Sequence, residues 1–240
     1  MKELGSCDGG ISGEHLISAS IMALLADDGD FTISGLPWIP AGETRAVGPK
    51  SLTANCLCRK HNSCLHPLDD AALKFFTALK SCLERKATDV KFIVSGHDLE
   101  RWLLKTVKAL AVSGNLARGQ EKLSGAFAKS IQVIEMIDDP QHWAAATGLY
   151  CVARQGAAME NNNRFQLAPF TNECGEIYGL WANILGVWFI LMLEPSDLPA
   201  TPQLKYAVFR PNQIVVRDRI STSWLALTGK ILCRTPTRYL

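Results

Sequence analysis

Hydrophobic periodicity changes near residue 140 of this 240-residue chain, and this change limits the possible folds more than any other feature. Before it, apolar residues recur at helical spacing; after it, the apolar segments are short and strand-like. Helices and strands that are segregated along a chain are typical of α+β proteins. We therefore predict an α+β fold with three regions: residues 1–87, a helical middle at 88–140, and an antiparallel sheet or sandwich at 141–240.

Two helices stand out in the first half of the sequence. Residues 66–86 begin with Pro67, which suits a first helical turn, and carry apolar residues at helical spacing. Residues 97–115 carry a second apolar stripe, with Asp98 predicted as the N-cap of a solvent-exposed charged turn. Weaker patterns predict a helix, a loop or hairpin, a strand and a further helix at residues 15–30, 35–51, 89–96 and 121–137.

Composition excludes several classes of protein. With 48% hydrophobic and 20% charged residues, the chain is too apolar to be disordered. Residues 67–130 hold eleven basic and seven acidic side chains, a weaker excess than a dedicated DNA-binding domain carries. The apolar run at residues 180–194 is shorter than the roughly 20 residues of a membrane-spanning helix. We expect a buried strand there, and no membrane association.

The eight cysteines are scattered and do not show the spacing of a disulfide scaffold. The first ten residues contain no apolar run typical of a signal peptide. These features predict a cytoplasmic protein with reduced thiols.

Two short polar segments hold three of the five histidines. The first, "SGEHLIS", contains the adjacent pair Glu14 and His15, and the second, "CLCRKHNSCLHPLD", brings Asn62, His66 and Asp69. Hydrolysis of a phosphodiester near neutral pH needs a base that activates water and a divalent cation that neutralises charge on the phosphate. These residue types supply both parts.

The order "GEHLIS", then "LCRKHN" and a helix, resembles the His-Asn-His (HNH) nucleases, whose ββα-metal motif commonly holds an acid-histidine pair and a Cys-x-x-Cys-Asn step. The resemblance implies that His15 is the general base and that Glu14 binds a divalent cation, Mg²⁺ or Mn²⁺. It implies that Asn62 orients His15 or helps to hold the cation. The third family position falls to His66 or Asp69. The implied activity is metal-dependent hydrolysis of DNA, in a role such as phage defence.

Many HNH nucleases also hold a structural Zn²⁺ between two Cys-x-x-Cys pairs. The resemblance implies half of such a site at Cys58 and His61. Cys7 begins the other half, but Gly10 stands where its partner cysteine is expected. Cys7, Cys58 and His61 are therefore the candidate ligands of a structural Zn²⁺, and Cys56 or Cys64 is an alternative to the missing cysteine, although neither has the expected spacing.

The whole chain also resembles a group of bacterial proteins with an HNH-like N-terminus and a β-rich C-terminal half, whose activity is not known. Two other functions fit the sequence. One is a catalytically inactive HNH-like module that binds nucleic acid or protein, which the glycine at position 10 favours. The other is a structural subunit whose β-rich region forms a homo-oligomer or binds a protein partner. Structural roles also fit single residues: Asn62 as a helix cap, His61 as a loop residue and His66 as the start of a helix.

Overall fold

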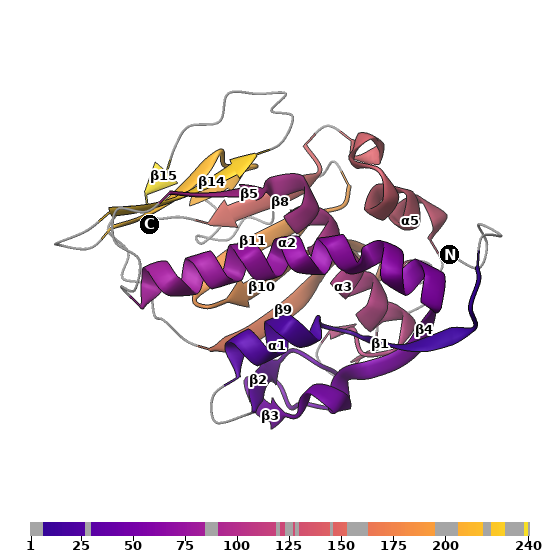
Figure 1. Cartoon of the computed structure of the whole chain (residues 1–240). Coiled ribbons are helices and arrows are strands. Elements are labelled where there is room, and N and C mark those ends of the chain that lie inside the picture. The colour runs from indigo at the N-terminus through magenta and orange to yellow at the C-terminus, as the bar shows by residue number, and fades with distance from the viewer. Residues whose placement is uncertain are drawn as a thin grey trace.

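Figure 1 shows the computed structural model of the chain, in which helices and strands of an α+β fold pack together. The structure describes residues 7–26, 30–84, 91–118, 121–122, 127, 130–144, 146–152, 163–194, 206–217, 222–228 and 238–239.

The N-terminal region contains a ββα element. Strand β1 (Ile11–His15) pairs antiparallel with β4 (Thr53–Cys58), and α2 (Arg59–Leu83) begins at the residue after β4. This arrangement corresponds to the ββα element that the resemblance to the HNH nucleases implies, although the two strands are far apart in sequence. The chain between them forms α1 (Ala19–Leu25), β2 (Phe31–Ser34), β3 (Arg45–Val47) and the short 3₁₀ helix η2 (Pro49–Leu52).

The long helix α2 starts seven residues earlier than predicted, so Pro67 and His66 lie inside it and not at its first turn. Proline lacks the N–H that would bond to the carbonyl of Ser63. Ser63 is exposed, so a water molecule can donate a hydrogen bond to its carbonyl, and the helix continues. Because Cys58 is the N-cap, Asn62 also lies inside the helix and does not cap it.

The two other long helices differ from the prediction at their N-termini. Helix α3 (Gly96–Val112) is capped by Ser95, whose Oγ accepts the N–H of Asp98 at 3.2 Å, so Asp98 lies in the first turn and is not the cap. Of the predicted helix at 121–137, residues 121–122 form a strand and α5 (Ile131–Asp138) begins after Ser130 as N-cap, while residues 123–126 and 128–129 lie outside the described part of the chain. The apolar periodicity predicts the buried faces of these two helices but does not identify Ser95 and Ser130 as their N-caps.

Two sheets contain most of the strands. The seven-stranded sheet has the order β12-β8-β11-β10-β9-β2-β3, and the four-stranded sheet has the order β15-β13-β14-β5. The β2–β9, β13–β15 and β14–β5 pairs are parallel, so the β-rich region is mixed and not wholly antiparallel as predicted. A short antiparallel pair is formed by β6 (Ala117–Arg118) and β7 (Glu121–Lys122). The other strands are β5 (Lys91–Ser95), β8 (Gly148–Val152), β9 (Arg164–Thr171), β10 (Ile177–Ile184), β11 (Val187–Met192), β12 (Ala207–Phe209), β13 (Gln213–Arg217), β14 (Thr222–Thr228) and β15 (Arg238–Tyr239).

The apolar run at residues 180–194 lies in the hairpin of β10 and β11. Leu185 and Gly186 form its turn with φ angles of 56° and 81°, the left-handed conformation that a tight two-residue hairpin requires. The prediction of buried strands is confirmed. No helix in the described part of the chain is long and apolar enough to cross a membrane.

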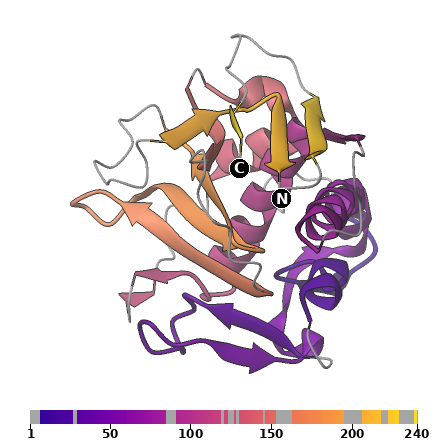
Figure 2. The same ribbon diagram turned by 90° about the vertical axis from the view of Figure 1, so that its left-hand side faces the viewer.

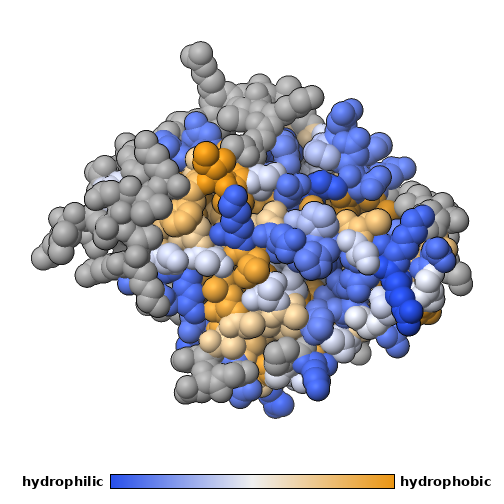
Figure 3. All heavy atoms as spheres, in the orientation of Figure 1, coloured by the Kyte–Doolittle hydropathy of each residue, from blue (hydrophilic) through white to orange (hydrophobic). Residues whose placement is uncertain are grey.

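One hydrophobic core joins the three predicted regions. Helix α2 crosses in front of β9, β10 and β11 in Figure 1, and the view turned by 90° in Figure 2 shows it to one side of them. The ring of Phe76 packs against Trp102 of α3 at 5.4 Å and against Phe189 of β11 at 6.1 Å. Since β2 and β5 also pair with β9 and β14, the three regions share both their core and their large sheets. Hydrophilic residues cover much of the face on which α2 lies (Figure 3).

Candidate metal site and the neighbouring carboxylate pair

Cys7, Cys58 and His61 lie together at the N-terminus of α2. Their ligand atoms are all within 4.8 Å of one another. His61 Nδ1 is 3.1 Å from the sulfur of Cys58 and 3.6 Å from the sulfur of Cys7. The structure thus brings together the three residues that the sequence named as candidate zinc ligands, and this group could hold a metal ion.

Backbone contacts explain why residues so far apart in sequence meet here. The N–H of Arg59 donates to the carbonyl of Gly10 at 3.0 Å, and Ile11 pairs with Cys58 across β1 and β4. Gly10 has a φ of 72°, which glycine adopts without strain. These contacts hold the segment before β1 against the first turn of α2 and bring Cys7 beside His61.

The environment of Cys58 favours its thiolate. The backbone N–H of His61 lowers the pKa of the Cys58 thiol more than burial raises it, and contacts with Asp8, Cys7 and Lys60 lower it further. A thiolate at the N-terminus of a helix is also stabilised by the helix dipole. The thiolate is the form that binds metal ions.

The environments of Cys56 and Cys151 disfavour their thiolates. Burial raises the pKa of the Cys56 thiol, and the negative charge of Glu14 raises it further. Burial alone raises the pKa of Cys151 to about 12. Both thiols therefore stay protonated at neutral pH.

A pocket of 580 Å³ adjoins the Cys/His group. Cys7, Cys58 and His61 line one part of it, and residues of α3 and α5 line another. Most of the latter side chains are apolar: Ala109, Val112, Ile134 and Ile137. The pocket therefore combines metal-ligating atoms with an apolar wall.

The predicted nuclease residues Glu14 and Asp69 meet at a lysine. Lys105 Nζ lies 2.8 Å from Glu14 Oε1 and 2.7 Å from Asp69 Oδ2, and the side chains of Lys105 and Glu14 are only 5% and 6% exposed. Ser18 donates to the other oxygen of Asp69 and accepts from the indole N–H of Trp102 at 2.9 Å. Two carboxylates, one from β1 and one from α2, thus share the buried ammonium of Lys105. Hydrogen bonds through Ser18 extend this network to Trp102.

The other predicted catalytic residues lie apart from this lysine. His15 follows Glu14 in β1, and consecutive side chains of a strand point to opposite faces. Asn62 Nδ2 donates to Ser12 Oγ at 3.3 Å. His66 is 71% exposed and its Nδ1 is 3.1 Å from Asp70 Oδ2 on the outer side of α2. Asn62 and His66 thus make their described side-chain contacts with partners outside the carboxylate pair, and His15 lies on the face of β1 opposite to Glu14.

Sequence reasoning missed Lys105 and Ser18. Lys105 stands one helical turn after Trp102, so it flanks the apolar stripe of α3, and this position is the only sign that its charge is buried. A lysine in such a position usually extends its ammonium to solvent. The partner carboxylates come from other elements, which a single sequence does not pair.

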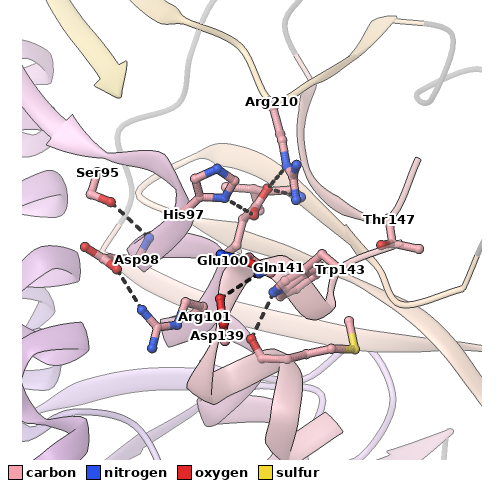
Figure 4. A network of polar contacts seen from close by, with 12 residues as sticks. Ser95, His97, Asp98, Glu100, Arg101, Asp139, Gln141, Trp143, Thr147 and Arg210 are labelled. Atoms are coloured by element: carbon pink, nitrogen blue, oxygen red, sulfur yellow. Dashed lines mark hydrogen bonds and ion pairs between the residues drawn. The ribbon is translucent and has the colours of Figure 1, made fainter. Parts of the chain in front are cut away.

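The turn at residues 97–101, predicted as exposed, contains a second buried carboxylate. Glu100 is 1% exposed; its Oε1 accepts from Arg210 Nε at 2.7 Å and from the backbone N–H of Leu149 at 2.9 Å. Figure 4 shows His97 on the same carboxylate, with Nδ1 3.2 Å from Oε2. The expectation of a solvated turn is wrong for Glu100, because α3 presents this residue to β8 and to Arg210.

The fold and the Cys/His group define an α+β protein with a candidate metal site beside a pocket. Comparison with family models, curated proteins and solved structures finds no match to this chain.

Proposed function

We propose that this protein is a non-hydrolytic binding module, in which a metal-stabilised ββα element is kept and the catalytic cation of a nuclease is replaced by Lys105. The observation that carries the proposal is the position of Lys105 Nζ between the oxygens of Glu14 and Asp69. A divalent cation would bind two such carboxylates from the same point.

The charges explain why a divalent cation is disfavoured there. To bind, the cation would have to displace an ammonium that is 5% exposed and that has two charged partners. Leaving a buried charge without its partner costs several kcal/mol, about 3–5 by comparison with other buried pairs. The same burial keeps a bulky phosphodiester away from Glu14.

Zn²⁺ is the metal that the Cys7–Cys58–His61 group fits best. Two thiolates and an imidazole are typical zinc ligands, and the lowered pKa of Cys58 supplies one thiolate readily. Bound there, the ion would tie the segment before β1 to the start of α2. It would thereby hold the two ends of the ββα element together.

A second candidate function, metal-dependent hydrolysis of DNA, is favoured by one specific observation. Glu14 and Asp69 converge on a single point from β1 and α2, the two elements that carry the corresponding residues in the HNH nucleases. If Lys105 moved away, Mg²⁺ or Mn²⁺ would take its place, and His15 would be the general base with Asn62 assisting.

A cleavage assay separates the two functions. Wild type and His15→Ala are incubated with supercoiled plasmid and with single-stranded DNA, in Mg²⁺ and in Mn²⁺. We expect no cleavage above that of His15→Ala in any of these reactions. Cation-dependent cleavage that is lost in His15→Ala would establish the nuclease and reject the binding module. Native gels of the same samples without divalent cation test whether the module retains DNA.

A further inference from the structure

We infer that a metal ion held by Cys7, Cys58 and His61 keeps one coordination position open, and that this position binds an apolar carboxylate lodged in the adjoining pocket. The inference deepens the proposed function and rests on the metal site proposed there. It names the chemistry of the molecule that the module binds.

The number of candidate ligands indicates an open coordination position. A structural zinc site is closed by four protein ligands, whereas a site with three leaves the fourth position to water or to another molecule. Among the described residues, the group of candidate ligands ends at three. The fourth cysteine of a paired Cys-x-x-Cys arrangement is replaced by Gly10, and a Cβ placed there meets no atom within 4 Å. The space at Gly10, which lines the same pocket as the three candidate ligands, is therefore open.

The metal site adjoins a pocket with apolar lining. All three ligands line the 580 Å³ pocket, whose volume lies in the range of pockets that hold small molecules. Its lining also includes the apolar residues Ala109, Val112, Ile134 and Ile137 from α3 and α5. An apolar body that enters the pocket can thus lie against these residues while its donor atom reaches the metal.

The net charge of the metal site permits an anionic donor. Zn²⁺ with two thiolates and a neutral imidazole carries no net charge, so the site itself accepts an anionic donor without strong repulsion. Lys105 and Lys108 line the pocket, but the charge of Lys105 is already held by Glu14 and Asp69. Lys108 Nζ donates to the carbonyls of Phe127 and Ser130, at 2.6 and 3.0 Å. The preference for a carboxylate follows from donor chemistry: a carboxylate oxygen is a common ligand of Zn²⁺, whereas an alkyl amine is protonated at neutral pH and offers no lone pair.

The test uses Co²⁺ as a spectroscopic substitute in the full-length reduced chain. Its visible absorption reports the ligands of the ion and their number. We expect Co²⁺ to bind with thiolate-to-metal absorption that is absent in Cys58→Ser, and we expect the d–d bands to change when hexanoate is added. Acetate should bind at least tenfold more weakly, because it lacks the methylenes that the pocket removes from water. 1-Hexanol, which has the chain but no carboxylate, should leave the bands unchanged.

Two matched variants separate the pocket from the metal. Val112 is 47% exposed and lines the pocket, while Ile93 on β5 is 61% exposed and does not line it. Val112→Trp should weaken hexanoate binding at least tenfold and leave Co²⁺ affinity and acetate binding unchanged. Ile93→Trp should change none of these values.

The outcomes distinguish the two levels of the proposal. If Co²⁺ binds through Cys58 but neither hexanoate nor acetate alters its bands, the open position is wrong and the structural metal site stands. If hexanoate binds no more tightly than acetate, the apolar part of the inference is wrong. If Co²⁺ does not bind through these residues, the metal site and the inference that rests on it are both rejected.

Discussion

Lys105 has two carboxylates within 2.8 Å and almost no exposed surface, so its charge is fixed inside the protein. Replacing it by methionine preserves the length of the side chain but leaves Glu14 and Asp69 as neighbouring buried anions. We expect Lys105→Met to lower the free energy of unfolding by about 3–5 kcal/mol, measured by urea denaturation. The matched control is Lys74→Met, an exposed lysine of α2, which should change it by less than about 0.5 kcal/mol. Equal effects for the two variants would show that Lys105 is not a buried partner.

Cys58 gives a prediction about pH. Because the pKa of the Cys58 thiol is lowered in the folded protein, its thiolate stabilises the fold above the ordinary thiol pKa. That stability is lost as pH falls through the lowered pKa of the folded state. In metal-free protein, the rate of alkylation of Cys58 by iodoacetamide should therefore rise at a lower pH in the native chain than in the urea-unfolded chain. Mass spectrometry of the Cys58 peptide gives both profiles; coincident midpoints would contradict the assignment.

At the level of single residues, the sequence indicated the candidate metal ligands but not the buried ion pairs of Lys105. Cys58 and His61 stand in a spacing that metal sites use, so their meeting could be expected from the chain itself. Lys105 lies 36 residues from Asp69, and nothing local to either residue requires their contact. A buried ion pair depends on how elements pack, which local spacing does not contain.

Among the secondary structure elements, β2 meets β9 through a close backbone approach at Gly35. Gly35 has a φ of 87°, and a Cβ placed there would lie 2.0 Å from the carbonyl oxygen of Leu167. Gly35→Ala should therefore destabilise the protein by about 2–4 kcal/mol, since it combines backbone strain with a clash against β9. Gly42 has a similar φ of 83° but no atom within 4 Å, so Gly42→Ala should cost only about 1–2 kcal/mol. Thermal unfolding of both variants compares the two costs, and equal costs would reject the clash.

Element types were predicted more reliably than their ends and partners. The apolar stripes at 66–86 and 97–115 correspond to α2 and α3, and the run at 180–194 corresponds to the β10–β11 hairpin. The start of α2 was placed too late because Pro67 is also the usual mark of a first turn. The parallel pairs that bring β2 and β5 into the C-terminal sheets join segments far apart in sequence, and alternation within a strand does not specify its neighbours.

Across the whole molecule, Glu100 connects three parts of the fold. Its carboxylate accepts a hydrogen bond from Arg210 (Figure 4) and another from the N–H of Leu149 in β8. Glu100→Gln removes the charge that Arg210 and His97 face, and we expect a loss of about 2–3 kcal/mol in the free energy of unfolding. Asp98→Asn, which weakens a more exposed ion pair with Arg101 on the same helix, should cost less than about 1 kcal/mol. Urea denaturation of the two variants measures this difference, and a neutral Glu100→Gln would rule out the connecting role.

The central claim is that the Cys/His group holds the metal while the carboxylate pair holds Lys105. Native mass spectrometry of the reduced full-length chain, after dialysis against Zn²⁺ and Mn²⁺ together, tests it in one measurement. The account predicts one Zn²⁺ per chain, absent in Cys58→Ser, and no bound Mn²⁺. A chain that carries Mn²⁺, and loses it in Glu14→Gln, would contradict the account, because a divalent cation would then occupy the place assigned to Lys105.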